Sequence, residues 1–392
     1  MAIGDGAAIG GGEAMTGSAP IRIVGGGPVS LLLRGLLVRQ GFASAELACD
    51  PVPETLPPWL AQRAIALSLG SWQLLTRIAH PPPSAPITTV EVTLRGAAGR
   101  TRLTAEELSA PALGHVVRYE ALHRALREGL DRIAPPTPSV PSAPSTPSPF
   151  PLPPSLPEPL PPSPPSITVI ADGNPGEDGR SRDFDQAALL ATVRVSRPQE
   201  GVAFERFTDE GPLALLPLPE SGLWSLVWCA PTAVSMKRLA MPAPALAALL
   251  RERFGPSLGE LDLADAPQLA PLHRRLRAKV AGDTEVAIGN AAQALHPVAG
   301  QGMNLGFRDA FALAQRLGDA RARGEPPAAA LRGFAGARRA DRFATVAVTD
   351  ALATIFTAPL LHPLESVALG ALDLAGPARR TLARAFMFGL RA

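Results

Sequence analysis

Two glycine-rich segments, one near the start of the chain and one near residue 300, hold the residues best suited to bind a cofactor. In the first, IVGGGPVS, Gly25 and Gly27 follow a short apolar run and precede a Leu-rich run. A strand that leads through such a turn into a helix lets the backbone approach a pyrophosphate, which the helix N-terminus stabilises. Ser30, a small residue, takes the third position of the G-x-G-x-x-G pattern. The segment predicts nucleotide binding, and a Gly-rich turn without a ligand is the alternative.

An acidic residue is expected at the end of the second strand, where it would bind ribose hydroxyls. Asp50 is the best candidate because it lies 25 residues after Gly25, and Glu46 is the alternative. Either carboxylate could instead be a solvated surface group.

The second segment, IGNAAQALHPVAGQGMNLGFRDAFALA, spans residues 288–314 and places Gly300 and Gly302 before a helix that begins near Met303. Main-chain amides at a helix start lack partners within the helix and carry partial positive charge. A flat, electron-rich ligand suits such a surface, and a reduced flavin, which is an anion, is such a ligand. Helix-end stabilisation of that charge is worth roughly 0.3–1 kcal/mol. A structural turn before a core helix is the alternative.

Residue periodicity predicts the elements that position these segments. Helices are predicted for the Leu-rich run that ends at Gly41 and for residues 63–78, 118–133, 242–280 and most of 303–392. Strands are predicted from Ile21, in AELACD, at 87–96, 167–173 and 284–290, and in several runs between 186 and 230. Both glycine-rich segments therefore lie between a strand and a helix.

Composition limits the class of protein. The chain of 392 residues is long enough for roughly two or three domains. Its two distant cysteines, Cys49 and Cys229, argue against a disulfide framework, and its scattered histidines offer no metal-ligand spacing. A formal charge of +2 does not indicate nucleic-acid binding. The abundance of Arg, Ala, Pro and Gly is typical of a GC-rich bacterial gene.

The hydropathy of the chain predicts neither a membrane span nor a secretion signal. The first residues lack the charged and apolar regions of a signal peptide and read as a disordered leader. No apolar run is long enough to predict a spanning helix.

A proline-rich segment interrupts the chain at residues 135–165, where 16 of 31 residues are proline. Proline lacks an amide donor, so this segment cannot form a helix or a central strand. An extended, semi-rigid linker is predicted, and a ligand for proline-binding modules is the alternative.

The chain resembles the FAD-dependent aromatic hydroxylases of ubiquinone biosynthesis, which belong to the single-component flavoprotein monooxygenases. The resemblance rests on IVGGGPVS, RAIALSLGSWQLL, ALGHVVRYEALHRAL, VIADG, ERFTDEGPLALLPL and IGNAAQALHPVAGQGMNLGFRDA, and it covers most of residues 21–390. It implies an α/β fold. An FAD-binding Rossmann-like domain of the glutathione-reductase/p-hydroxybenzoate-hydroxylase type would be interleaved with a mainly antiparallel β substrate domain, followed by a C-terminal helical region.

The resemblance also implies a division of the chain. The FAD-binding domain would comprise residues 20–80, 97–134, 166–185 and 271–345, and the substrate domain residues 81–96 and 186–270. A leader (1–19), the Pro-rich linker (135–165) and the C-terminal helical region (346–392) complete the chain. The family normally has strands where this linker lies, so a β layer that covers the nucleotide domain is expected to be missing or replaced.

Individual residues match the family's cofactor-binding motifs. Glycines of the first segment match the pyrophosphate turn, Arg118 an arginine that contacts FAD, and the "DG" pair a motif associated with both FAD and NAD(P)H. Arg63 begins another family motif. The cofactor-binding residues implied are Gly25, Gly27, Ser30, Asp50, Arg63, Arg118, Asp172, Gly173, Gly289, Asn290, Pro297, Gly300, Gly302, Met303 and Asn304.

The implied reaction is hydroxylation of the aromatic ring of a polyprenylated phenol. A flavin C4a-hydroperoxide formed with O2 would deliver the oxygen, with NADPH or NADH as reductant. This chemistry needs few protein acids or bases, so no catalytic residue is assigned. His296 is expected to pack or to form a hydrogen bond, with proton transfer as the alternative. A small soluble aromatic substrate and a non-catalytic flavoprotein scaffold remain alternative functions.

The C-terminus offers a basic amphipathic helix that suits a membrane interface. Its basic residues are Arg380, Arg384 and Arg391, and its apolar residues are Leu382, Phe386 and Leu390. A terminal helix packed on its own domain fits the same pattern. The expected location is the cytoplasm, with peripheral contact to the inner membrane through this helix. Other ubiquinone-biosynthesis proteins are further candidate partners.

Overall fold

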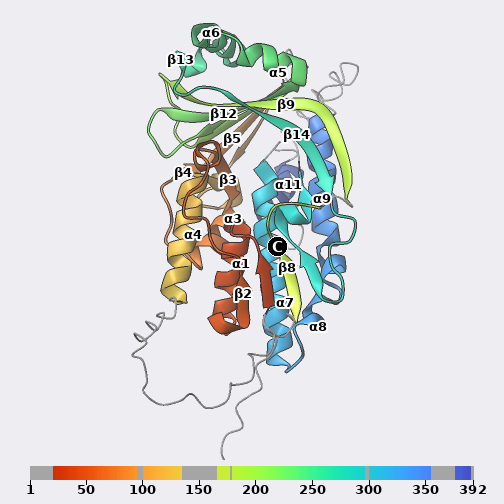
Figure 1. Cartoon of the computed structure of the whole chain (residues 1–392). Helices are drawn as coiled ribbons and strands as arrows, with labels where there is room; N and C mark the ends of the chain where they lie inside the picture. Colours follow the sequence, from red (N-terminus) through yellow and green to blue (C-terminus); the bar gives the residue numbers. More distant parts are fainter. Residues whose placement is uncertain are drawn as a thin grey trace, which may run out of the picture.

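The computed structural model describes residues 21–94, 100–134, 166–176, 179–295, 300–354 and 376–389. Figure 1 shows two parts, with helices packed around a small sheet in the lower half of the view and a large curved sheet across the upper half. The predicted linker (135–165) and leader (1–19) lie outside the described residues.

A parallel sheet forms the centre of the lower part. Its strands, in order, are β15 (Glu285–Ala287), β8 (Ile167–Ile170), β1 (Ile21–Val24) and β2 (Leu47–Cys49). Parallel strands are covered on both faces, and Ile21, Ile23 and Val169 are accordingly buried. Because the strands run the same way, their carboxyl ends meet at one edge, which is where ligands bind in open α/β sheets.

Three long helices pack around this sheet. They are α1 (Pro28–Arg39), α4 (Tyr119–Ile133) and α7 (Gln301–Ala322). Helix α1 contacts both of the others, and the proline at its first position suits a helix start. On α4 the four-residue spacing of Leu122, Leu126 and Leu130 places all three in the core, as the sequence predicts.

The large sheet is mainly antiparallel. Its order within the described residues is β16 (Gln293–Ala294), β14 (Gln268–Leu276), β9 (Arg180–Val195), β12 (Leu223–Pro231), β11 (Gly211–Pro217), β10 (Val202–Thr208), β5 (Thr89–Leu94) and β6 (Arg100–Thr104), with β13 (Leu261–Leu263) paired to β9. One face packs around Trp224 and Leu246 against α6 (Ala243–Phe254), with α5 (Thr232–Leu239) beside it. The opposite face looks toward the lower part (Figure 1).

A small antiparallel sheet lies between the two parts. It consists of β3 (Ala64–Ser68), β7 (Gly114–Arg118) and β4 (Ser84–Ile87), with α2 (Pro58–Ala61) and α3 (Leu69–Thr76) next to β3. Backbone pairing with β7 holds β3 against α7, and this contact matters for the site below.

Helices complete the described chain: α8 (Ala328–Leu331), α9 (Phe334–Thr354) and α11 (Gly376–Phe388). On α11, Ala383 and Met387 are buried against α3 and β3, so this side of the helix packs on its own protein. Arg380 and Arg384 are exposed. Among the described residues, no helix has both the length and the apolar composition that crossing a bilayer requires.

Two helix predictions are wrong in part. The run 63–78 begins as strand β3, because the helical spacing of its apolar residues spans a strand–helix junction and pairing with β7 decides the first half. The run 242–280 is helical only to Phe254, after which β13 and β14 join the large sheet.

The strand pairing also crosses the expected division of the chain. β6 pairs with β5 in the large sheet although it falls within the range 97–134 assigned to the FAD-binding domain. β14 continues past residue 271 along β9. The interval between α4 and β8, where the family has strands, lies outside the described residues except for Ala134 and Ser166.

Candidate functional site

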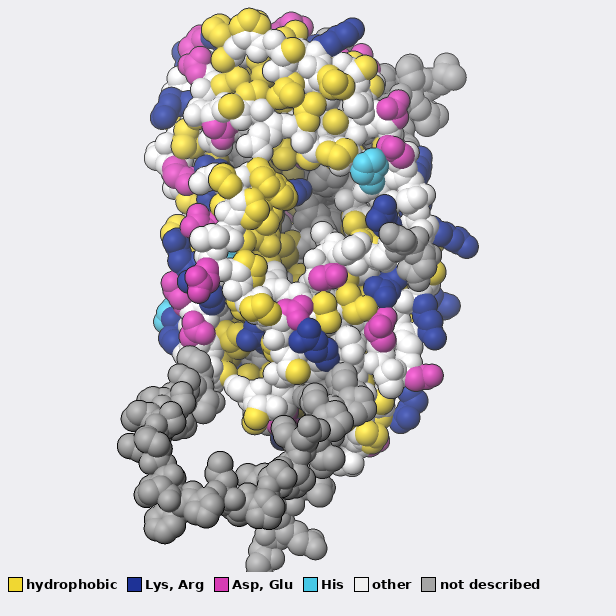
Figure 2. All heavy atoms as spheres, viewed as in Figure 1, with side chains coloured by type: hydrophobic (Ala, Val, Ile, Leu, Met, Phe, Trp, Pro, Cys, Tyr) yellow, Lys and Arg dark blue, Asp and Glu magenta, His cyan; other side chains and the backbone are white. Residues whose placement is uncertain are grey.

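A cavity of about 1130 Å³ lies between the carboxyl edge of the parallel sheet and the inner face of the large sheet. Its walls include Gly27 at the start of α1, Gly300–Asn304 at the start of α7, and side chains of β5, β10, β11 and β12. Figure 2 shows the molecule hollowed between its two parts, with hydrophobic side chains gathered beside the opening. The two glycine-rich segments, about 275 residues apart in sequence, thus share one crevice.

The first two glycines of the first turn have no room for side chains. Gly25 has a φ of +105°, and a Cβ there would lie 2.6 Å from the carbonyl oxygen of Ala171. A Cβ on Gly26 would lie 2.9 Å from the carbonyl oxygen of Pro51. Gly27 faces the cavity, and no side chain caps the start of α1 there. A ligand can therefore approach the first amides of α1 directly.

Ser30 is accommodated inside this turn. Its side chain is fully buried, and its hydroxyl donates a 2.6 Å hydrogen bond to the carbonyl oxygen of Gly25. The serine therefore braces the turn and does not line the cavity.

Both acidic candidates bind other groups of the protein. Asp50 accepts a 2.8 Å hydrogen bond from the Gly25 amide and forms an ion pair with Arg22. Glu46 binds Arg321 at 2.7 Å. Neither carboxylate lines the cavity, so Asp50 holds the glycine turn from the side, and its contact with a ribose stays a prediction.

The second helix start is also open. Gly300 has a φ of +58° and precedes α7 without a side-chain cap or an acidic residue in the first turn. Gln301, Gly302 and Met303 line the cavity beside Asn290. Two uncapped helix N-termini, those of α1 and α7, therefore open into the same space, where they favour an anionic ligand.

Asn304 lines the cavity, but its side-chain amide forms hydrogen bonds with the protein backbone. Its oxygen accepts a 2.9 Å hydrogen bond from the Ser68 amide, and its nitrogen donates to the carbonyl oxygens of Ala66 at 3.1 Å and Gly300 at 3.0 Å. The residue therefore fixes the start of α7 to β3.

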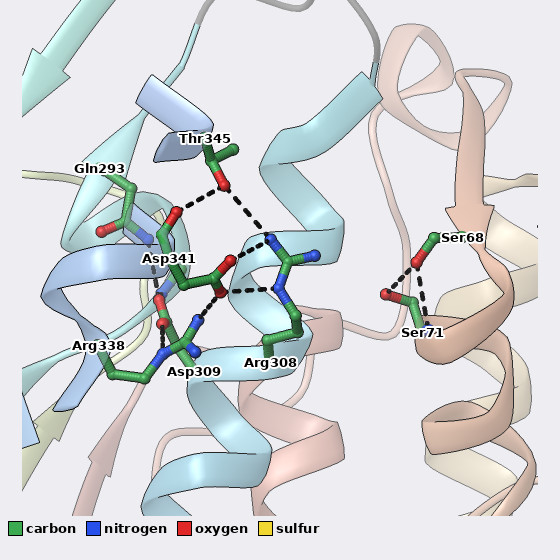
Figure 3. Close-up of polar contacts among 9 residues, drawn as sticks. Ser68, Ser71, Gln293, Arg308, Asp309, Arg338, Asp341 and Thr345 are labelled. Carbon is green, nitrogen blue, oxygen red and sulfur yellow. Dashed lines mark hydrogen bonds and ion pairs between the residues drawn. The ribbon is translucent and has the colours of Figure 1, made fainter. Parts of the chain in front are cut away.

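Gly289 is held by a buried ionic network between α7 and α9. The Gly289 amide donates to Asp309 at 3.2 Å, and Asp309 pairs with Arg338 at 2.8 Å. Asp341 joins Arg338 to Arg308 (Figure 3). Burial alone would raise the pKa of Asp341, but the two guanidinium groups hold that pKa below its usual value. The network was not predicted, because it joins two helix segments that are about 29 positions apart and each segment has an ordinary helical context.

Two arginines and the "DG" pair stand at the cavity wall. The Arg63 guanidinium faces the cavity and forms no hydrogen bond or ion pair with any described residue. Arg118 donates a 2.7 Å hydrogen bond to the carbonyl oxygen of Gln62 and pairs with Glu220. Asp172 and Gly173 are exposed at the cavity rim, directly after β8. Pro297 and His296 lie outside the described residues.

His123 is a further residue that the sequence analysis missed. It is buried on α4, and its Nε2 lies 3.0 Å from the carbonyl oxygen of Gly26. Burial lowers the pKa of His123, which favours the neutral ring as a hydrogen-bond donor to that carbonyl. Its only signal in the sequence is its place in the RYEALHRAL helix.

These features fit FAD. The bare turn at Gly25–Gly27 and the Arg63 cation, which no described residue pairs, suit a pyrophosphate, and the α7 start suits the flat, electron-rich end of the molecule. The apolar inner face of the large sheet leaves room for a second, hydrophobic ligand beside it.

Comparison with known proteins agrees with this geometry. Residues 176–348 match the family model described as FAD binding domain. The chain is 30% identical to the ubiquinone hydroxylase UbiL of Rhodospirillum rubrum over 96% of this chain and 92% of that protein. It is 28% identical to the 3-demethoxyubiquinol 3-hydroxylase of Escherichia coli, over 92% of this chain and 96% of that protein.

Solved structures show the same fold. The p-nitrophenol 4-monooxygenase PnpA of Pseudomonas putida superimposes with a TM-score of 0.68 at 15% identity, covering 96% of this chain and 99% of that one. The predicted α/β fold class is therefore confirmed, and the family match confirms FAD as the cofactor.

Proposed function

The chain belongs to the FAD-dependent hydroxylases of ubiquinone biosynthesis, and from this premise we propose that it hydroxylates the aromatic ring of a polyprenylated phenol. As a member of that family it is a monooxygenase that uses FAD with NADPH or NADH as reductant. The observation that carries the proposal is the single cavity that joins both glycine-rich segments to an apolar sheet face.

The protein's part in this chemistry is to bind and to orient. FAD, when bound, would pass two electrons from NADPH or NADH to O2, so that one oxygen atom of O2 enters the ring and the other leaves as water. The backbone at Gly25–Gly27 and the Arg63 guanidinium would hold the pyrophosphate, and the first amides of α7 would stabilise negative charge on the ring system. Asn290, which lines the cavity, would lie along the ribityl chain, and the buried Gly289 would lie behind it.

The sheet face supports a prenylated substrate over a small soluble one. It presents Val92, Ala214, Val227 and Leu190 to the cavity, which suits an aromatic ring with an alkyl chain. The exposed indole of Trp59 lines the same cavity at its edge, where it offers an apolar wall to a chain that leaves the pocket.

Peripheral contact of a cytoplasmic protein with the inner membrane is a part of the proposal that rests on α11. Arg380 and Arg384 are exposed there, and anionic headgroups attract such residues. Because Ala383 and Met387 pack on the protein, the contact would be electrostatic, without insertion of that side. Flotation with anionic liposomes should fall when both arginines become glutamate, and unchanged flotation would remove this part.

The central test combines spectrum and product. The purified protein should show the bands of an oxidised flavin, and with NADPH or NADH it should place an atom from isotopically labelled O2 on the ring of a short-chain prenylphenol. Turnover of simple hydroxybenzoates alone would favour a soluble substrate. A colourless protein that does not bind added FAD would favour the non-catalytic scaffold.

A further inference from the structure

One carboxylate interrupts the apolar wall of the cavity. Glu205, in the middle of β10, lines the cavity and pairs across the sheet with Val92 on β5 and Ala214 on β11. The same cross-strand row continues through Thr101 on one side and Val227 on the other, and these residues also line the cavity. Glu205 is thus the charged group in a row of uncharged side chains.

Glu205 is partly buried, and it has no partner among the residues that the structure describes. Its carboxylate forms no hydrogen bond or ion pair with any of them. Burial raises the pKa of Glu205 to about 7, because the carboxylate loses contact with water and gains no hydrogen bond or ion pair from the described residues in return. A buried acid without a partner costs stability, and such groups concentrate at functional sites.

The side chains around Glu205 are uncharged, so its carboxylate is available to a ligand in the cavity. The flanking strands contribute Val92 and Ala214, and Val348 of α9, which contacts β11, is also uncharged. On β12 of the same sheet, Cys229 also lines the cavity, and its thiol pKa is raised by burial and then by Glu205, so the thiol stays neutral. The remaining titratable groups of the cavity are His273 on β14 of the same sheet and, outside this sheet, Arg63, Arg118, Tyr119, Asp172, Asp265 and Arg379.

We propose that the Glu205 carboxylate accepts the hydrogen bond of the phenolic hydroxyl of the substrate and so fixes the orientation of the ring in the cavity. This inference rests on the proposed function and names the contact that would recognise its substrate. A hydrogen bond from a phenol to a carboxylate draws the proton toward Glu205 and increases the electron density of the ring, which an electrophilic hydroxylation requires. The same charge would repel a substrate that carries its own carboxylate.

The test compares three ligands on the FAD-loaded protein. A short-chain prenylphenol can donate the hydrogen bond, its methyl ether cannot, and the matching prenylated benzoate carries a carboxylate in place of the hydroxyl. Dissociation constants are measured at mildly alkaline pH, where Glu205 is ionised, for the wild type, for Glu205→Gln and for Glu91→Gln. Glu91 is a matched control because it lies on β5 with its side chain on the opposite face of the same sheet.

The wild type should favour the phenol over its ether by about tenfold or more, the range of a hydrogen bond to a charged group. In Glu205→Gln this preference should shrink to a few-fold while the benzoate binds more tightly, and Glu91→Gln should match the wild type. A misfolded variant would weaken all three ligands, so the opposite movements separate the proposed contact from general damage. Equal phenol-to-ether ratios in the wild type and Glu205→Gln would overturn the inference.

Failure of the proposed function gives a different result. If the wild type binds neither the phenol nor the ether, or binds the phenol without hydroxylating it, the substrate assignment fails. Loss of the phenol preference in Glu205→Gln, with hydroxylation intact in the wild type and in Glu91→Gln, supports both statements.

Discussion

The side chain of Asn304 on α7 accepts a hydrogen bond from the backbone amide of Ser68 on β3, although the two residues are 236 positions apart. The same side chain donates to the carbonyl oxygen of Ala66. One side-chain amide therefore satisfies an N–H group and a carbonyl group on the free edge of β3. The Asn304 side chain thus joins strand β3 to the start of α7, which faces the cavity. Asn304 therefore positions the site through the protein, in addition to any contact with the cofactor.

Replacing Asn304 with Ala should weaken both folding and FAD binding. The change leaves the Ser68 amide and the Ala66 carbonyl without partners, at a cost of about 1–3 kcal/mol in the free energy of unfolding. Urea unfolding and an FAD titration measure the two effects. Asn174→Ala, which removes an amide from an exposed loop hydrogen bond, should leave both unchanged. Wild-type stability and affinity in Asn304→Ala would show that this contact does not hold the site.

Gly27→Ala should lower FAD affinity without lowering stability. The position has ordinary φ, and a Cβ there would meet only the Tyr119 hydroxyl, at 3.6 Å, so the protein tolerates the methyl group. The methyl would point toward the space that the pyrophosphate needs, and a loss of at least about tenfold in affinity is expected, or about 1.4 kcal/mol. Gly336→Ala on α9, where the added atom meets nothing within 4 Å, is the control. Unchanged FAD affinity in Gly27→Ala would place the pyrophosphate elsewhere.

The glycine turns could be predicted because their chemistry is local. A strand, bare glycines and a helix follow one another in sequence, and the structure brings both such segments to one cavity. The run 63–78 shows the limit of local reasoning. Its apolar residues repeat with helical spacing, yet pairing of β3 with β7 turns the first half into a strand.

The supporting groups left weaker signals. Asp309 and Arg338 are 29 positions apart on different helices, and nothing in either segment indicates that they meet. Asn304 was identified by its motif, but its partners on β3 come from tertiary contact alone. Glu205 did leave a signal, because a charged residue at an inward position of an apolar strand breaks the alternation that a core strand requires.

Asp309→Asn should destabilise the protein strongly. Asp309 and Arg338 are both buried, and breaking a buried ion pair by removing one charge costs about 3–5 kcal/mol. The Gly289 amide also loses a charged acceptor, so FAD affinity should fall as well. Asp319→Asn on the exposed side of the same helix is the control for unfolding experiments. A loss below about 1 kcal/mol, the size of an exposed pair, would contradict a structural role for the network.

The pH dependence of stability should identify Glu205. Burial raises its pKa from an ordinary value of 4.5 to about 7, so the folded state binds more protons than the unfolded state between these values. Stability therefore falls as pH rises from about 4.5 to about 7, and the full penalty is present above that range. The shift corresponds to at most about 3 kcal/mol in the free energy of unfolding, and water in the cavity that hydrates the carboxylate would reduce this value.

Urea unfolding at a series of pH values, with FAD saturating throughout, measures this effect. The free energy of unfolding of Glu205→Gln should rise relative to that of the wild type across this pH window, and the difference should persist at higher pH. Glu91→Gln should show no such gain, and a constant difference between Glu205→Gln and the wild type at every pH would mean that Glu205 is hydrated in the folded protein.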